Sequence, residues 1–276
     1  MSESGERGLI PRLEAVEVPP GMLVILGLGQ AGVGIRGPEG VIYVDPYLTD
    51  YGGEGERLDR CFGPPVDPAA IDDASCVLVS HEHVDHFDPE TLGSIASSSP
   101  GARFYAPYAC DFSKAGIDPE RVTVPAVDEP FEVAGARITA VPSAHTGLER
   151  TDRGYRYLGY VIECNGVTVY HAGDTVVYDG MIETLSRWRL DAMFLPINGR
   201  DYFRTAREIV GNTDFREAVE LAETLDVGMV FPTHYDLVAG NTENPAYFVD
   251  YINRRNLHRP YHLLRPGELF ALLGRG

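Results

Sequence analysis

The segment Ser80-His81-Glu82-His83-Val84-Asp85-His86 places three histidines and an aspartate within six positions, and it is the strongest signal in the chain. Neutral imidazoles and carboxylates are suitable ligands for zinc, manganese or iron. In an extended loop the side chains of His81 and His83 point the same way and can hold one ion. The turn that follows can direct Asp85 and His86 toward a second ion. A metal centre therefore explains this segment better than a solvated polar loop does.

The residues on either side of this segment predict a strand before it and a helix after it. An apolar run, Cys76–Val79, leads to Ser80, and a helix is expected over Pro89–Ala96 with Asp88 as its N-cap. The histidines thus lie in a strand-to-helix loop. A zincin helix of the HExxH type is excluded, because the fourth residue after His81 is an aspartate.

Three more candidate ligands follow apolar runs further along the chain, namely His145, Asp174 and His234. Each is bounded by small residues, as expected of a loop that presents ligands at the edge of a sheet. Alone, each of these would be a hydrogen-bonded histidine or a capping aspartate more often than a ligand. Together with the 81–86 segment they supply five histidines and two aspartates, enough for two divalent ions.

The stretch Gly27-Leu-Gly29-Gln-Ala-Gly32 fits the GxGxxG pattern of dinucleotide-binding proteins, but the residues after it do not. That pattern requires a helix that opens at the third glycine. Gly34 and Pro38 oppose a helix there, and Val41–Val44 has the composition of a returning strand. A glycine-containing β-hairpin is therefore expected in place of a nucleotide-binding loop.

The composition is that of a globular protein with a sizeable core, since 44% of the 276 residues are hydrophobic and 23% are charged. We expect one domain over residues 1–276, with an irregular N-terminal extension over 1–20. The formal net charge of −18 repels phosphate backbones and anionic lipids, which excludes nucleic acid and membrane surfaces as partners. Four scattered cysteines and an N-terminus without an apolar run predict a soluble, cytoplasmic protein.

Strands dominate the first part of the predicted secondary structure, whereas strands and helices alternate in the second half. Two apolar runs, Leu158–Glu163 and Val167–Tyr170, flank Asn165-Gly166, a strong signal for a hairpin turn. Helices are expected near Tyr108–Ala115 and over Phe215–Thr224, among others. This order predicts two packed sheets covered by helices.

The chain resembles the metallo-β-lactamase superfamily in the order of its candidate ligands. The matching features are HxHxDH over 81–86, a lone His145, Gly-Asp-Thr around Asp174, and His234 near the end. The resemblance covers about residues 22–272. It implies a fold of the α+β class, the αββα sandwich, with the site along one edge.

The same resemblance implies how two metal ions share the ligands. One ion would be held by His81, His83 and His145, and the other by Asp85, His86 and His234. Asp174 would bridge the two ions. Asp45 occupies the place of the superfamily's early aspartate, and His171 is expected to support the ligands from behind rather than to bind metal.

The second half of the chain is similar to L-ascorbate-6-phosphate lactonases. Four stretches carry this likeness: Pro196–Asp201, Gly211-Asn212, Thr233–Asp236 and Gly240–Pro245. The likeness implies manganese as the metal, with zinc as the alternative, and a phosphorylated sugar lactone such as L-ascorbate 6-phosphate as the substrate. The chain is shorter than these lactonases between His86 and His145, a region that could line the substrate pocket. The likeness therefore supports the type of reaction better than it supports the particular substrate.

The expected chemistry is hydrolysis by a hydroxide that bridges two metal ions. Two such ions lower the pKa of a shared water and stabilise the oxyanion that forms at a carbonyl or phosphoryl centre. Asp85 is expected to orient this nucleophile and to accept or pass on its proton. The candidate substrate-binding residues are Arg200, Arg204, Asn198, Asn212 and Tyr235. The arginines match a small anionic, phosphorylated substrate, although ion pairs with Asp201, Glu208 or Asp214 would explain them equally well.

Three functions remain open at this stage. The first is a metal-dependent lactonase, the second is a phosphodiesterase that acts on a small or cyclic phosphodiester, and the third is a non-catalytic metal-binding regulatory module. The complete ligand set disfavours the third, and the net negative charge disfavours RNA substrates. The sequence leaves open whether the protein forms a homo-oligomer.

Overall fold

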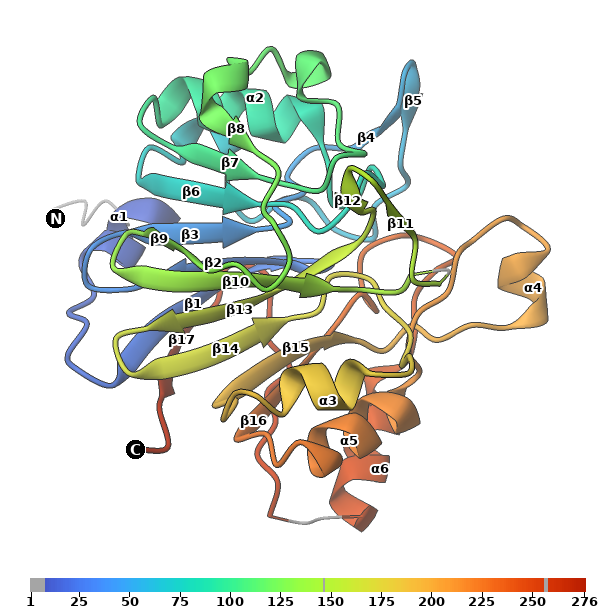
Figure 1. The fold of residues 1–276 in the computed structure, drawn as a ribbon. Coiled ribbons are helices and arrows are strands. Elements are labelled where there is room, and N and C mark those ends of the chain that lie inside the picture. Colours follow the sequence, from blue (N-terminus) through green and yellow to red (C-terminus); the bar gives the residue numbers. More distant parts are fainter. Residues whose placement is uncertain (1–7, 146, 256–257) are drawn as a thin grey trace, which may run out of the picture.

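Two β-sheets packed face to face form the centre of the molecule (Figure 1). This computed structural model describes residues 8–145, 147–255 and 258–276. The first sheet has the strand order β17 (Leu269–Leu273), β1 (Met22–Gly29), β2 (Gly32–Arg36), β3 (Val41–Val44), β6 (Ala74–Leu78), β7 (Arg103–Tyr105), β8 (Val122–Thr123). The second has the order β16 (Met229–Thr233), β15 (Ala192–Pro196), β14 (Val167–His171), β13 (Leu158–Cys164), β10 (Ala136–Pro142), β9 (Phe131–Val133).

The strands are apolar on both faces because each sheet is buried on both sides. Successive side chains of a strand point to opposite faces of its sheet. In β1, Leu23 and Ile25 pack between the two sheets, whereas Val24 and Leu26 pack in the layer outside the first sheet. Three stacked layers of apolar side chains result, and they fix the two sheets relative to each other.

Helices cover the outer face of each sheet. Those on the first sheet are α1 (Leu9–Glu14) and α2 (Pro89–Ser98). Those on the second are α3 (Met181–Leu185), α5 (Phe215–Thr224) and α6 (Pro245–Arg255). The expected αββα sandwich is therefore confirmed.

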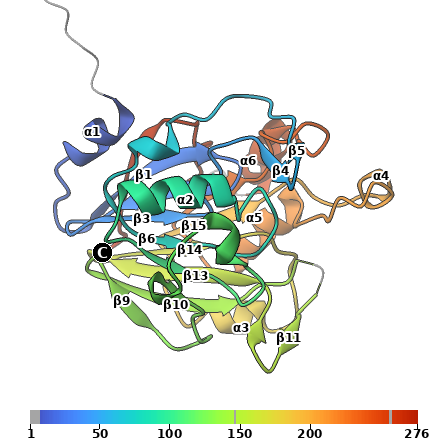
Figure 2. The same cartoon turned by 90° about the horizontal axis from the view of Figure 1, so that it is seen from above.

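The loops between the main strands and helices contain several shorter elements. They are the hairpins β4 (Tyr51–Gly53) with β5 (Glu56–Arg57) and β11 (Arg150–Thr151) with β12 (Gly154–Tyr155), the helix α4 (Tyr202–Thr205), and the 3₁₀ turns η1 (Pro68–Ala70), η2 (Phe112–Ala115) and η3 (Pro119–Arg121). The loop that carries α4 projects from the body of the molecule in both views (Figures 1 and 2). Over the described ranges, no helix combines the length and the apolar character needed to cross a membrane.

The direction of the strands decides where the functional loops lie. In the second sheet β14, β15 and β16 are parallel, and β10 runs the same way because both β10 and β14 pair antiparallel with β13. The arrowheads of β6, β10 and β14 point to the same side of the molecule in Figure 1. The loops that follow these strands therefore meet at one edge of the sandwich.

Several local predictions are confirmed. Asn165 and Gly166 both have positive φ (52° and 79°), as the tight turn between β13 and β14 requires. Asp88 caps α2 by accepting hydrogen bonds from the main-chain N–H groups of Glu90 and Thr91. The glycine-rich stretch forms the β1–β2 hairpin, in which Gly29 pairs with Gly32.

Two local predictions are wrong. The described part of the 1–20 segment is not irregular throughout, because it contains α1, whose Ile10 and Leu13 side chains are buried in the outer layer of the first sheet; residues 1–7 lie outside the described residues. The helix expected near Tyr108–Ala115 is only the 3₁₀ turn η2, which ends at Gly116 in the left-handed conformation (φ 65°). Short amphipathic segments of this kind take their structure from the surface they cover rather than from local propensity.

Candidate metal centre

Four loops bring the candidate ligands to the shared edge of the sandwich. The loop from β6 to α2 carries His81, His83, Asp85 and His86. His145 follows β10, Asp174 follows β14, and His234 follows β16. Each loop leaves a buried strand and therefore starts from a rigid position.

The structure brings all seven predicted ligands together. Three overlapping groups have ligand atoms within 4.8 Å of one another: His81, His83 and His145; His81, His86 and Asp174; Asp85, His86 and His234. The first and third groups are the two sets that the family resemblance implies. Asp174 lies between them, with its carboxylate oxygens 3.2 Å from His86 Nε2, 3.4 Å from His145 Nε2 and 3.1 Å from His234 Nε2.

The donor atoms at this edge have the character of metal ligands. The buried Nε2 atom of His81 has no hydrogen-bond partner among the described residues, and Nε2 of His86 and Oδ1 of Asp174 form an ion pair with each other at 3.2 Å, so both belong to the cluster itself. A buried polar atom without a partner is costly, so such atoms cluster where a ligand completes the site. Imidazole nitrogens and carboxylate oxygens converging in this way fit divalent ions such as zinc, manganese or iron.

Asp45 orients two of the ligands from behind. Its carboxylate accepts hydrogen bonds from Ser80 N (2.7 Å), Ser80 Oγ (2.7 Å) and His86 Nδ1 (2.8 Å). Because the Ser80 hydroxyl donates to Asp45, its oxygen can accept a hydrogen bond from the N–H group at His81 Nδ1, 2.9 Å away. One buried carboxylate thus leaves Nε2 of both His81 and His86 free to face the metal centre, an arrangement typical of histidine ligands.

His171 supports the site through its two ring nitrogens and is not left free to bind metal. Its Nε2 atom lies 2.7 Å from the carbonyl oxygen of Ala31, to which it donates. Its Nδ1 atom accepts a hydrogen bond from Gly173 N at 3.2 Å. The ring therefore connects the β1–β2 turn to the loop that carries Asp174. Burial lowers the pKa of His171, which keeps the ring in this neutral form.

The charges of the metal-free cluster divide the histidines into two pairs. Burial lowers the pKa of His81 well below its ordinary value and that of His145 to about 4, so both rings are neutral at pH 7. Burial would also lower the pKa values of His86 and His234, but the neighbouring aspartates outweigh it. They raise the pKa of His86 well above its ordinary value and that of His234 to about 10.

The two aspartates of the cluster stay ionised. Burial would raise their pKa values, but His86 and His234 beside them hold the pKa of Asp85 and that of Asp174 well below the usual range. The raised pKa values of His86 and His234 mean that both rings carry a proton at pH 7 when no ion is bound. A divalent ion must displace those protons, because a ligating imidazole has to be neutral.

A pocket of about 410 Å³ opens outward from the cluster. Its wall beyond the ligands is largely apolar and is formed by Leu58, Val84, Ile209, Val210, Val238 and Ala239. The polar residues of the wall are Glu82, Glu208 and Asn241. Among the lining residues that the structure describes, none is a lysine or an arginine.

The structure does not place Arg200 or Arg204 in this wall. Arg200 makes a two-pronged ion pair with Glu217 (2.6 and 2.7 Å) and donates to the carbonyl oxygen of Asn212 at 2.8 Å. Arg204 donates to the carbonyl oxygens of Asn198 and Thr242. The geometry therefore gives no support to a phosphate clamp built from these arginines, because both pair with other groups of the protein and neither lines the pocket.

The other predicted substrate-binding residues lie behind the pocket. The Asn212 side chain donates to Asn198 Oδ1, and the Asn198 side chain donates to Asn241 Oδ1, both at 3.1 Å. This chain of amides reaches the pocket only at Asn241, which sequence reasoning missed. Tyr235 packs against the apolar layer between the second sheet and its helices.

Gln30 is a second residue of the centre that sequence reasoning missed. It occupies the β1–β2 turn, is 5% exposed, and donates from Nε2 to Asp85 Oδ2 at 2.7 Å. The signal that could have found it was the glycine-rich stretch itself, which the sequence explains only as a hairpin.

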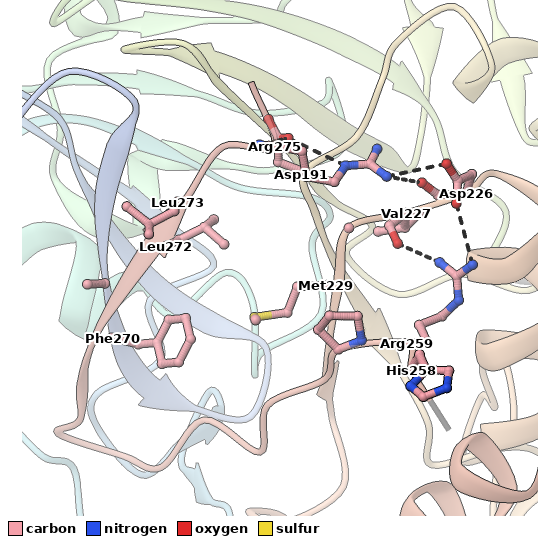
Figure 3. A pocket seen from close by; sticks show the side chains of 13 residues that line it. Asp191, Asp226, Val227, Met229, His258, Arg259, Phe270, Leu272, Leu273 and Arg275 are labelled. Atoms are coloured by element: carbon pink, nitrogen blue, oxygen red, sulfur yellow. Dashed lines mark hydrogen bonds and ion pairs between the residues drawn. The ribbon is translucent and has the colours of Figure 1, made fainter. Parts of the chain in front are cut away.

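A second pocket lies at the opposite ends of β15 and β16, between their first residues and β17 (Figure 3). It has a volume of about 530 Å³ and contains two arginines, Arg259 and Arg275. Both arginines pair with Asp226, and Arg275 also lies close to Asp191. Its cations are therefore already neutralised, in contrast to the unpartnered ligands at the metal edge.

The fold and the ligand cluster together define a class: an αββα sandwich with a histidine- and aspartate-rich metal centre along one edge. The chain belongs to the β-lactamase superfamily domain family, whose model matches residues 41–235. It thus has the fold and the candidate ligands of a metal-dependent hydrolase of this superfamily.

Individual relatives agree with this placement. A UPF0173 metal-dependent hydrolase of Thermococcus onnurineus is 29% identical over 255 residues, covering 91% of this chain and all of the relative. Among solved structures, Igni18, a metallo hydrolase from Ignicoccus hospitalis, aligns with a TM-score of 0.69 at 20% identity, covering 91% of this chain and 98% of that one. An isothiocyanate hydrolase from Delia radicum gut bacteria aligns with a TM-score of 0.72 at 15% identity, covering 91% and 100% of the two chains.

Proposed function

We propose that the protein is a dinuclear metal hydrolase that opens a small carboxylic ester, most readily a lactone, whose body is apolar rather than phosphorylated. The observation that carries the proposal is the pairing of a seven-ligand cluster with an adjoining pocket whose outer wall is mostly apolar. The names of the relatives support a metal-dependent hydrolase. The choice of ester, the count of two ions and the choice of manganese or zinc belong to the proposal.

The residues present fit such ions, as the unpartnered Nε2 atom of His81 and the convergence of His86 with the carboxylate of Asp174 indicate. The two ligand sets would be His81, His83 and His145 on one side and Asp85, His86 and His234 on the other, with Asp174 between them. When bound, divalent ions supply a Lewis acid and lower the pKa of water toward neutrality.

The chain's own residues then orient the attacking water. Asp85 is ionised, only 15% of its side chain is exposed, and it lines the pocket, so its carboxylate can accept a hydrogen bond from a water placed there and orient that water for attack. Asp45 fixes the rings of His81 and His86 and so prevents them from turning away. The apolar wall excludes bulk water from the substrate's far side.

The pocket wall carries the proposal for the substrate. A phosphate would meet the carboxylate of Glu208 in a protein of net charge −18, and none of the described lining residues is a lysine or arginine that could offset this repulsion. Glu82 adds little to the repulsion, because Arg156 already pairs with it at 2.5 Å. An apolar ring substituent would instead pack against Leu58, Ile209 and Val238. A phosphorylated lactone and a small phosphodiester are the competing substrates.

The test is a comparison of turnover on matched substrates with protein loaded with manganese or zinc. We expect kcat/KM to be highest for lactones with aliphatic substituents, lower for the phosphorylated sugar lactone and lowest for a cyclic phosphodiester. Preference for the phosphorylated lactone would refute the apolar-substrate proposal. Preference for the phosphodiester would refute the ester proposal as a whole.

A variant of the wall sharpens this test. Ile209→Ala removes three carbons from the pocket wall, which would contribute about 2.4 kcal/mol if fully buried. Because Ile209 is only half-buried, we expect about half of this contribution, which raises KM for an aliphatic lactone by about tenfold. Ile182→Ala is the matched control, because Ile182 is 41% exposed on α3 and does not line the pocket. Equal KM values for the two variants would remove Ile209 from the proposed site.

A further inference from the structure

The β1–β2 hairpin is built so that its turn reaches the metal centre. Gly29 has φ 90°, and a Cβ atom there would lie 2.9 Å from the ring of Phe62. A Cβ atom on Gly32 would lie 2.9 Å from the carbonyl oxygen of Asp45. The glycines of the GxGxxG stretch therefore serve close packing, and the residue they present at the tip of the turn is Gln30.

Gln30 contacts two members of the same ligand set. Its side-chain Nε2 atom donates to Asp85 Oδ2 at 2.7 Å and lies 3.0 Å from His234 Nε2. Its main-chain carbonyl oxygen accepts a hydrogen bond from His234 N at 2.9 Å. The orientation of the amide follows from chemistry, because an ionised carboxylate only accepts hydrogen bonds and must face the NH₂ group. Gln30 itself has φ 55°, a conformation that non-glycine residues adopt at a cost.

The hydrogen bond to Asp85 gains importance once a metal is bound. In the metal-free structure Asp85 Oδ2 also lies 3.1 Å from His234 Nε2. A ring nitrogen that binds an ion can no longer donate to a carboxylate. Of the donors to Asp85 Oδ2 found in the described residues, Gln30 is then the one that remains.

We propose that Gln30 is a positioning residue for the metal set formed by Asp85, His86 and His234, which it fixes through its side chain on Asp85 and its main chain on His234. This inference rests on the dinuclear site proposed above but not on any substrate. It explains why the chain keeps a polar side chain buried in a strained turn, 204 residues away from His234 in sequence.

The experiment is a metal titration of the metal-free protein by calorimetry, with Mn²⁺ and separately with Zn²⁺. Gln30→Met keeps the length of the side chain but removes the donor. Gln30→Asn keeps an amide and tolerates positive φ, but it is one methylene too short to reach Asp85. Removing a residue that supports a ligand typically weakens metal affinity by about 10- to 100-fold. We expect a loss of this size for one of the two ions in both variants, with the other ion unaffected.

Asp236→Asn is the matched control. Asp236 Oδ1 accepts a 3.4 Å hydrogen bond from Gln30 N and so belongs to the same turn, but it makes no contact with Asp85. The control should keep the wild-type affinity for both ions. Thermal unfolding of each metal-free variant reports separately on the fold.

The outcomes are distinguishable from those of the functional proposal. Wild-type affinity for both ions in Gln30→Met and Gln30→Asn would overturn the inference, whatever their unfolding temperatures. Equal losses in Asp236→Asn would overturn it too, because the effect would then belong to the turn. If the wild type binds only one ion, the dinuclear proposal fails. The Gln30 inference then fails as well if the two Gln30 variants bind that single ion as tightly as the wild type does.

Discussion

The loop after β6 and the loop after β15 start at the same edge of the sandwich, yet only the first is a site. In the first loop, the buried Nε2 atom of His81 has no hydrogen-bond partner among the described residues, and Nε2 of His86 faces only the other candidate ligands Asp174 and Asp85. In the second, Arg200 already pairs with Glu217, and Arg204 donates to two main-chain carbonyl oxygens. Neither arginine lines the pocket beside the metal cluster. The comparison teaches that functional residue types mark a site only where their polar atoms are buried and left unpaired.

The largest expected effect is that of Asp174→Ala, which should abolish binding of both ions and reduce turnover to background. Asp174 lies within 3.4 Å of His86, His145 and His234, so its loss removes the link between the two ligand sets. The measurement is metal content after dialysis, together with turnover on the best lactone.

Asp191→Asn is the matched control for Asp174→Ala. Asp191 is also buried, but it lies at the other end of β15 and accepts hydrogen bonds from Thr168 N and Arg275 N. The variant should lose stability and keep both ions. Equal metal loss in the two variants would show that metal binding does not depend specifically on the ligand cluster around Asp174.

Asp85→Asn should reduce kcat by about 10²–10⁴-fold, the usual cost of losing a positioned acid–base group. The expected effect is smaller than that of Asp174→Ala because Asp174 lies close to histidines of both ligand sets, whereas Asp85 belongs to one. The measurement is kcat at saturating metal, with metal content determined in parallel. Turnover near that of the wild type with both ions bound would remove Asp85 from the mechanism.

Metal binding should release protons, because His234 has a pKa of about 10 in the metal-free protein. Apparent affinity should fall about tenfold per pH unit below that value for each proton displaced. The buffer dependence of the binding enthalpy measures the number of protons released. Binding without proton release at pH 7 would contradict the charge distribution described for the cluster.

The same raised pKa makes the stability of the metal-free protein depend on pH in a definite direction. Because the folded-state pKa of His234 lies above its ordinary value of 6.5, its contribution is complete below pH 6.5 and is lost as the pH rises to about 10. Urea unfolding of the metal-free protein should therefore show stability falling over this interval. The metal-loaded protein, in which His234 is already neutral, should not show that loss.

The smallest expected effect is that of Arg200→Ala. Its ion pair with Glu217 lies at the surface, so the variant should lose only about 0.2–1 kcal/mol of stability. We expect kcat/KM to change equally little on phosphorylated and unphosphorylated forms of one lactone. A selective loss on the phosphorylated form would reverse the comparison of the two loops and restore Arg200 as a phosphate ligand.

Local sequence patterns predicted much of the fold, because they depend on interactions between near neighbours. The N-cap at Asp88, the turn at Asn165-Gly166 and the bounds of the helix Phe215–Thr224 all follow from residues within a few positions. The α1 helix at Leu9–Glu14 was missed because it is short and is stabilised by burial of Ile10 and Leu13 against a distant sheet.

The sequence by itself determined the ligand types, their order and their places at the ends of strands, since a metal centre demands particular donor atoms and buried strands carry an apolar signature. Tertiary structure alone decided which polar atoms remain unpaired. Glu217 neutralises Arg200, Asn241 replaces Asn198 and Asn212 at the pocket, and Gln30 reaches Asp85. These pairings join residues that are far apart in the chain, so they depend on the register of strands and the packing of two sheets, which no local pattern encodes.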